Sequence, residues 1–255
     1  IPHDLLRETD LLEMHVHEDA SKVDLEKALQ AKERLLRRAF ERLDSNAAFE
    51  HFCHEEAAWL EPFSLYMALS KESQGASWTT WPKDIVAQVP EALNQASRRL
   101  APELDYQRFV QWLFFEQWDK LRAYAAHRGI GLIGDLPLFV AMDSADVWWN
   151  RDLFLVSDAG QAQAVAGVPP DYFSQTGQKW GNPLYDWERL QEREYAWWVE
   201  RVRKACETVD LVRIDHFRGF EAYWEVPADA PTAETGRWVP GPGDAFFEAL
   251  SQSLG

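Results

Sequence analysis

The sequence is poor in cysteine, in basic residues and in long apolar runs. Its 255 residues include two cysteines, Cys53 and Cys206, which lie far apart and form no metal-type or redox motif, so we do not expect a disulfide framework. Lysine and arginine number 26 against 42 aspartates and glutamates, a formal net charge of -16, which argues against nucleic acids and anionic membranes as partners. No stretch approaches the roughly 20 consecutive apolar residues of a membrane span, and the first residues carry no signal-peptide pattern. These absences predict a cytoplasmic protein that acts on a neutral molecule.

Hydrophobic residues and tryptophans, by contrast, are plentiful. The chain is 46% hydrophobic, which is enough for one large domain or two smaller ones with a substantial core. It contains 13 tryptophans, and several lie near Gly, Pro, Asn and Asp outside any helical stripe. Flat aromatic faces stack on sugar rings, but tryptophan also fills cores, so we expect both roles here.

The first 100 residues are predicted to be helical. Apolar residues recur at helical spacing from Asp24 to Leu43, and a second helix is predicted from Asn46 to Trp59. Because proline favours the first turn of a helix, we expect a third helix from Pro62 to Lys71 and a short one from Pro90 to Leu100. Histidines occur in two close pairs, His15 with His17 and His51 with His54. Neither pair has a third ligand at a zinc-type spacing, so no metal site is expected.

The second part of the chain alternates helices with short apolar strands. A long helix from Asp105 to His127 precedes a strand predicted from Ile130 to Asp135, and a helix from Trp187 to Thr208 precedes a strand that ends before Asp215. Consecutive units of this kind form parallel sheets in which successive strands are usually neighbours. We therefore expect Asp135 and Asp215 on adjacent parallel strands that open into one cleft.

Arg213 and Asp215 are expected to form an ion pair at the end of the second strand. Residues two apart in a strand share a face, so the guanidinium can reach the carboxylate. A positive neighbour keeps a carboxylate ionised, and an ionised carboxylate in a polar cleft is what covalent catalysis at a sugar carbon requires. Structural ion pairs also occur at strand ends, so spacing alone leaves both interpretations open.

Between the two strands lies a long segment, from Asp143 to Asp186, with few helical signals and many aromatic and turn residues. It is predicted to be a loop without regular structure. A loop of that size inside a compact domain is usually functional.

Three motifs connect the chain to a known family: Gly134 to Val140, Gly167 to Tyr185, and Val212 to Phe220. Together they resemble 4-alpha-glucanotransferases of the amylomaltase, or disproportionating enzyme, type in glycoside hydrolase family 77. The resemblance covers the whole chain, because the stretches Trp59 to Leu65 and Gln111 to Phe115 are also similar to segments of a helical insertion in that family.

The resemblance implies an α/β fold that is part of a TIM-type (β/α) barrel with a helical insertion subdomain. Residues 1–100 would form the insertion, and residues 101–255 would form a partial barrel that carries the third and fourth strands and, over about residues 143–186, the aromatic substrate loop. Asp215 would be the catalytic nucleophile, Arg213 and His216 would line the subsite of the reacting glucose, and Asp135 would have a supporting role. The loop would contribute these glucan contacts: Asp171, Tyr172, Phe173, Gln178, Trp180 and Asn182. No cofactor or metal is implied.

The implied activity is the transfer of α-1,4-glucan segments, with retention, to the 4-hydroxyl of glucose or another glucan. The substrates would be maltooligosaccharides and glucans derived from starch or glycogen. Two alternatives stay open: a glucan hydrolase of the wider α-amylase clan, and a non-catalytic carbohydrate-binding fragment. The chain begins at Ile1 without Met, and neither Glu221 nor Glu225 lies in the family's acid/base motif. We therefore expect an internal fragment that is inactive alone.

Overall fold

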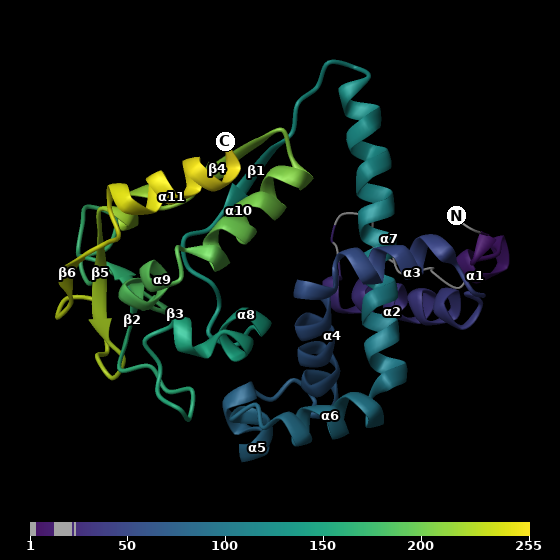
Figure 1. Cartoon of the computed structure of the whole chain (residues 1–255), viewed down its shortest axis with the longest axis horizontal. Helices are drawn as coiled ribbons and strands as arrows, with labels where there is room; N and C mark the ends of the chain where they lie inside the picture. The colour runs from purple at the N-terminus through teal and green to yellow at the C-terminus, as the bar shows by residue number, and fades with distance from the viewer. Residues whose placement is uncertain (1–3, 13–21, 23) are drawn as a thin grey trace.

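The amino-terminal helices begin where their capping residues predict. The computed structural model describes residues 4–12, 22 and 24–255 (Figure 1), so the pair His15 and His17 lies outside the described residues. After a short helix α1 (Glu8–Leu12), Asp24 caps α2 (Leu25–Glu41) by accepting a hydrogen bond from the backbone of Lys27, and Asn46 caps α3 (Ala47–Glu55). Both helices are therefore confirmed at their starts, although α3 ends at Glu55 and Trp59 belongs to the next helix. Their first turns are stabilised by side-chain oxygens that accept otherwise unpaired N–H groups.

The next helix begins earlier than the sequence predicted. Helix α4 (Ala57–Glu72) contains Pro62 in its interior, so the prediction that Pro62 starts the helix is wrong. A proline at this position removes one backbone hydrogen bond, the one to the carbonyl of Ala58, and the rest of the helix is kept by its packing. Leu60, Leu65 and Leu69 of α4 are buried.

Helix α7 (Ala101–Ala126) is the longest element and connects the helical part of the chain to the strands (Figure 1). It follows a 3-10 turn η2 (Trp78–Thr80) and two short helices, α5 (Lys83–Val86) and α6 (Pro90–Arg99). Its first half packs on α2, α3 and α4, and its Phe109 and Trp112 are buried. Its second half is more open, since Phe114, Leu121 and Tyr124 are 52%, 53% and 57% exposed.

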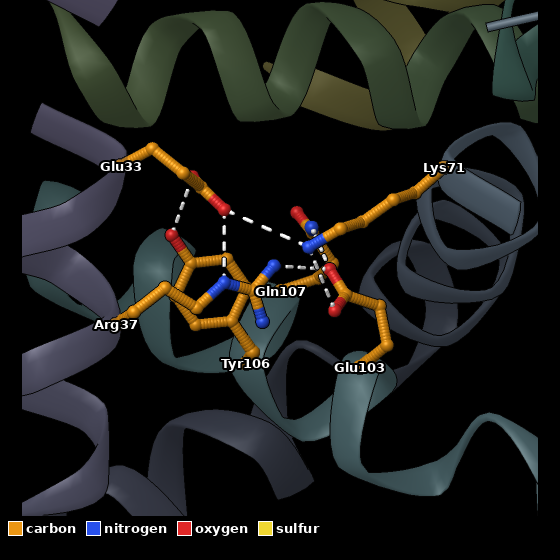
Figure 2. Close-up of polar contacts among 6 residues, drawn as sticks. All are labelled: Glu33, Arg37, Lys71, Glu103, Tyr106 and Gln107. Carbon is orange, nitrogen blue, oxygen red and sulfur yellow. Dashed lines mark hydrogen bonds and ion pairs between the residues drawn. The ribbon is translucent and has the colours of Figure 1, made fainter. Parts of the chain in front are cut away.

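A half-buried charged network joins α2, α4 and α7, and Figure 2 shows it. Arg37 of α2 donates to Glu103 of α7 at 2.6 Å and to Glu33 at 2.9 Å, and its guanidinium lies 3.3 Å from the ring centroid of Tyr106. Lys71 of α4 reaches Glu103 at 3.2 Å. The network thus connects three helices through paired charges.

The two strands predicted to end in aspartates pair in parallel, as expected. Strand β1 (Ile133–Leu136) lies beside β4 (Leu211–Ile214) with Asp135 opposite Arg213. Asp215 is the first residue after β4, whereas Asp135 lies inside β1 because that strand extends one residue further than predicted. Helices α9 (Trp187–Glu192) and α10 (Ala196–Thr208) precede β4, and the chain's last helix is α11 (Asp244–Leu254).

The segment from 143 to 186 is ordered, so the prediction of a loop without regular structure is wrong. It contains α8 (Ala145–Trp149), a 3-10 turn η3 (Arg151–Leu153) and two strands, β2 (Ala164–Val168) and β3 (Gln178–Pro183). These strands join β5 (Ala222–Pro227) and β6 (Arg237–Pro240) in an antiparallel sheet of order β3-β2-β5-β6. Strand β2 pairs with β5, which follows far along the sequence, and β3 pairs with β2. Glycines and a proline hide the strand pattern locally.

One core connects the helical part of the chain to the strands. Trp78, Trp148 and Trp198 are fully buried in it, together with residues of α4, α10 and α11. Trp78 is fixed from two sides, because its indole donates to the carbonyl of Met142 at 2.8 Å and its backbone N–H donates to Asp143 at 3.1 Å. Across the described residues, no helix is both long and apolar enough to cross a membrane, and no group of three or more His, Cys, Asp and Glu residues could hold a metal ion.

Candidate active site

Three charged side chains gather where β1 and β4 lie side by side. Nη1 of Arg213 donates to Oδ2 of Asp135 at 2.5 Å, and Nη2 donates to Oδ1 of Asp215 at 2.5 Å. The backbone N–H of Asp215 donates to the carbonyl of Leu136 at 2.9 Å, which continues the pairing of β4 with β1 by one residue. The predicted neighbouring strands and the predicted Arg213–Asp215 ion pair are confirmed, and the contact between Arg213 and Asp135 is an addition to that prediction. The backbone of Asp215 is held by the strand pair.

This charged cluster faces solvent. The side chains of Asp135, Arg213 and Asp215 are 59%, 58% and 52% exposed. The charge of Asp135, and after it the hydrogen bond to Asp215, raises the pKa of Arg213 above its usual value, so the guanidinium stays protonated between the two carboxylates. An open cluster of this kind can be reached by a molecule the size of a sugar.

His216 packs next to the cluster in a left-handed backbone conformation. Its φ is 53°, a region that side chains other than Gly, Asn, Asp and His rarely adopt. Its imidazole lies 4.9 Å from the ring of Trp180, edge to face, and 6.4 Å from Phe139. Burial lowers the pKa of His216, against the opposing effect of the Asp215 carboxylate, and its Nε2 has no hydrogen-bond partner among the described residues. The Nε2 atom is itself buried, so it does not face the solvent side of the cluster.

The residues of the segment 143–186 differ in how they contribute to the surface around the charged cluster. Trp180 is 39% exposed, contacts His216, and donates from its indole to Gln178 at 3.0 Å. Asn182 donates to the carbonyl of Val140 at 2.8 Å, so its amide nitrogen supports the chain after β1.

The turn that precedes β3 makes its hydrogen bonds with itself. Oδ1 of Asp171 accepts the backbone N–H groups of Phe173 and Ser174, both at 2.8 Å, while Tyr172 and Phe173 are fully exposed. The structure therefore brings Trp180 to the charged cluster through His216, and it places Tyr172 and Phe173 on a solvent-facing turn.

Sequence reasoning missed Arg201 and the role of Phe139. Nη2 of Arg201 donates to the carbonyl of Pro137 at 2.8 Å, and Nη1 lies 3.3 Å from both the carbonyl of Leu138 and the hydroxyl of Tyr185. These contacts hold the segment after β1 that carries Phe139, the ring beside His216. Arg201 lies in a helix with ordinary amphipathic spacing and its main acceptors are backbone carbonyls, so no side-chain motif could reveal it.

A carboxylate at the carboxyl end of parallel strands is typical of barrel enzymes that act on glycosidic bonds. The comparisons with known proteins agree. The chain belongs to the 4-alpha-glucanotransferase family, whose sequence profile matches residues 3–255.

Individual relatives give the same result. A 4-alpha-glucanotransferase of Synechocystis sp. is 46% identical over 241 residues, which are 92% of this chain and 48% of that protein. One from Thermus thermophilus is 49% identical over 212 residues, 83% of this chain and 42% of that protein. The structure of an amylomaltase from Streptococcus agalactiae in complex with acarbose aligns with a TM-score of 0.93 and 33% identity, covering 98% of this chain and 52% of that one. The chain spans about half the length of the curated relatives it matches.

Proposed function

We propose that this chain carries the nucleophile of a retaining 4-alpha-glucanotransferase, with Asp215 in that role. The observation that supports this most directly is the state of the Asp215 carboxylate, which is fixed at the end of β4 and still half exposed. Arg213 binds its Oδ1, so Oδ2 is the oxygen that attacks the anomeric carbon. The product of this step is a covalent glycosyl-enzyme, which the 4-hydroxyl of a second glucan then resolves.

The neighbouring side chains would hold the reacting glucose. Asp135 binds the other end of the Arg213 guanidinium and so fixes its orientation toward Asp215. His216 would border the reacting glucose, and its edge-to-face contact with Trp180 orients its ring. Trp180 would cover a glucose face, while Asp171, Tyr172, Phe173, Gln178 and Asn182 would lie along the acceptor side.

The reaction also needs an acid, and we infer that it comes from outside these 255 residues. Retaining enzymes place the acid about 5–5.5 Å from the nucleophile. Glu225 lies in β5 and accepts a hydrogen bond from Arg237 at 2.7 Å across the sheet. This contact supports a structural role for Glu225. We therefore expect the isolated chain to be inactive.

The same proposal extends to the architecture and the substrate. Parallel neighbours β1 and β4, with active residues at their carboxyl ends, fit the third and fourth strands of a TIM-type barrel, with residues 1–100 as a helical insertion and 101–255 as part of the barrel. The substrates we propose are maltooligosaccharides and glucans from starch or glycogen, consistent with the names of the relatives, and the location we propose is the cytoplasm.

The test uses the full-length protein that carries this segment and maltotriose as substrate. Transfer yields longer oligomers together with glucose, whereas hydrolysis alone yields glucose and maltose. Asp215→Asn should abolish turnover and leave glucan binding largely in place. The matched control is Asp210→Asn, which changes a carboxylate at the other end of β4 that accepts from the backbone of Leu132.

Two results would contradict the proposal. If Asp215→Asn keeps turnover within about tenfold of the unaltered protein, the nucleophile is another group. If the isolated 255 residues transfer maltosyl or glucosyl units robustly, the acid lies within this chain.

A further inference from the structure

The three residues after β1, Pro137, Leu138 and Phe139, connect the strand pair to the aromatic side of the candidate site. Strand β1 ends at Leu136, whose carbonyl accepts the backbone N–H of Asp215 at 2.9 Å. Pro137 has no N–H group, so the segment cannot continue the ladder of strand hydrogen bonds. The carbonyls of Pro137 and Leu138 accept from side chains instead.

Arg201 of α10 supplies most of these hydrogen bonds. Its Nη2 donates to the carbonyl of Pro137 at 2.8 Å, and its Nη1 lies 3.3 Å from both the carbonyl of Leu138 and the hydroxyl of Tyr185. That hydroxyl in turn donates to the carbonyl of Leu138 at 2.9 Å, and both residues are almost fully buried. A planar guanidinium can meet several acceptors at fixed angles, which a lysine cannot do.

The orientation of Arg201 is itself fixed. Its guanidinium carbon lies 4.7 Å from the ring centroid of Trp198, which is fully buried, and 5.4 Å from that of Trp197. Cations are attracted to aromatic faces at such distances. The guanidinium therefore stands between a rigid aromatic wall and the backbone of the segment after β1.

Phe139 carries this arrangement to the candidate site. Its ring stacks on Tyr185, with centroids 6.0 Å apart and planes 16° apart. On other sides the same ring lies 6.4 Å from His216 and 6.4 Å from Trp180, which contact each other at 4.9 Å. The position of Phe139 thus decides where these two rings rest.

The backbone of the segment also lies tightly against the turn of His216. A Cβ at Gly219 would collide with Leu138 and come within 3.0 Å of the His216 ring. Because such packing leaves no free space, a displacement of Leu138 reaches His216 directly.

We propose that Arg201 is a positioning residue for the transfer reaction: it fixes residues 137–139 so that Phe139 holds the rings of His216 and Trp180 beside the reacting glucose. The proposal rests on the proposed function, which puts His216 and Trp180 at that glucose. Arg201 acts through Phe139 and does not touch the sugar.

The first test measures kcat and KM for maltotriose in the full-length protein that carries this segment. Arg201→Met should lower kcat roughly 10- to 100-fold, because small misplacements of the groups around a reacting centre have effects of this size. KM should stay within about 3-fold, since contacts to the other sugars are kept. Arg203→Met is the matched control, because Arg203 lies on the same helix, carries the same charge and pairs with Glu200. It should leave both constants as they are.

The second test needs no substrate and reads the pKa of His216 by nuclear magnetic resonance. Burial lowers this pKa, and Phe139 is part of what buries the imidazole. Arg201→Met should therefore raise the pKa toward 6.5. The charged groups that act on the imidazole, Asp215 and Arg218, are unaltered in this variant.

Three further variants separate positioning from charge and from folding. Tyr185→Phe removes the hydroxyl that joins Arg201 to Leu138 without a change of charge, and it should shift kcat and the pKa in the same directions by less. Arg201→Lys keeps the charge but cannot span both carbonyls, so it should fall between the unaltered protein and Arg201→Met. Arg201→Met combined with Phe139→Leu should be no slower than Phe139→Leu alone, because both act through one ring.

Each outcome decides between the alternatives. If Arg201→Met has the kcat, KM and His216 pKa of Arg203→Met, or if its loss and that of Phe139→Leu multiply in the double variant, the proposal is overturned. If Arg201→Met does not fold, Arg201→Lys and Tyr185→Phe decide by the same criterion. If Asp215→Asn retains turnover while Arg201→Met still lowers kcat and raises the pKa, the proposed nucleophile fails and the positioning role stands.

Discussion

Removing Arg37 should destabilise the chain more than removing any single exposed ion pair. In the network of Figure 2, Arg37→Ala deletes the 2.6 Å hydrogen bond to Glu103, the 2.9 Å bond to Glu33 and the contact with the Tyr106 ring. The side chain of Glu103 is 17% exposed, so it cannot recover these interactions fully from water. It keeps Lys71 at 3.2 Å and Gln107 at 2.9 Å.

The expected loss can be bounded from these contacts. A fully exposed pair contributes about 0–1 kcal/mol, and breaking a fully buried pair costs about 3–5 kcal/mol. The network is half-buried and Lys71 remains, so we expect Arg37→Ala to lower the free energy of unfolding by about 2 kcal/mol, including the cation–π contact with Tyr106. Arg99→Ala is the control, because Arg99 and Glu72 are 52% and 41% exposed, and it should cost less than about 0.5 kcal/mol.

The pH dependence follows from the pKa of Glu103. Burial opposes ionisation of Glu103, but the hydrogen bonds from Arg37, Gln107 and Lys71 together outweigh it and lower the pKa. Because the folded-state pKa is the lower one, the stabilisation is complete above the usual value of 4.5 and is lost as the pH falls through the folded-state value. A measurement at pH 7 therefore includes the whole contribution of ionised Glu103 to the free energy of unfolding.

Urea unfolding at pH 7 of Arg37→Ala, Glu103→Gln and the double variant completes a double-mutant cycle. The coupling between Arg37 and Glu103 should be about 1 kcal/mol, since contacting charged residues usually couple by 0.5–3 kcal/mol. A coupling below about 0.3 kcal/mol would refute the view that this pair connects α2 to α7 energetically.

Three further outcomes test the site and its packing. Nuclear magnetic resonance titration should give His216 a pKa below 6.5, and Asp215→Asn should lower it further because the carboxylate charge favours the imidazolium; an upward shift contradicts the assigned contact. Trp180→Ala should impair transfer to an acceptor at an unchanged melting temperature, and a sharp fall in melting temperature with full transfer would make Trp180 a core residue. Gly219→Ala should cost about 1–3 kcal/mol, because a Cβ there would collide with Leu138 and approach His216; Gly131→Ala, where the nearest atom is 3.7 Å away, is its control in the same urea unfolding series.

The sequence was sufficient to predict the strands and their pairing where the local residue pattern and the rules of strand topology agree. Val212 and Ile214 mark a strand by themselves, and the helix before it makes a parallel neighbour the expected arrangement, so Asp135 and Asp215 could be placed together. Strands β2 and β3 could not be found in this way. Gly167 and Pro183 break their pattern, and both strands depend on the sheet that β5 completes.

In the candidate site, too, some contacts could be predicted from sequence spacing and others could not. Arg213 and Asp215 are two residues apart, so their pairing follows from strand geometry alone. Arg201 acts through backbone carbonyls of a segment that is distant in sequence. Interactions of this kind have no spacing to detect.

The order of strands in the antiparallel sheet also bears on how the chain folds during synthesis. Helices α2 to α7 find most of their partners within the first 126 residues, although α4 also packs on α8. Strand β2, by contrast, lies between β3 and β5, so one of its edges waits for Ala222–Pro227 to emerge. At the usual speed of translation this delay is roughly 3–10 s. During that interval the apolar residues Val165 and Ala166, buried in the finished sheet, lie on an open edge that can pair with another chain. Slower synthesis therefore lengthens the period in which nascent chains can aggregate through β2.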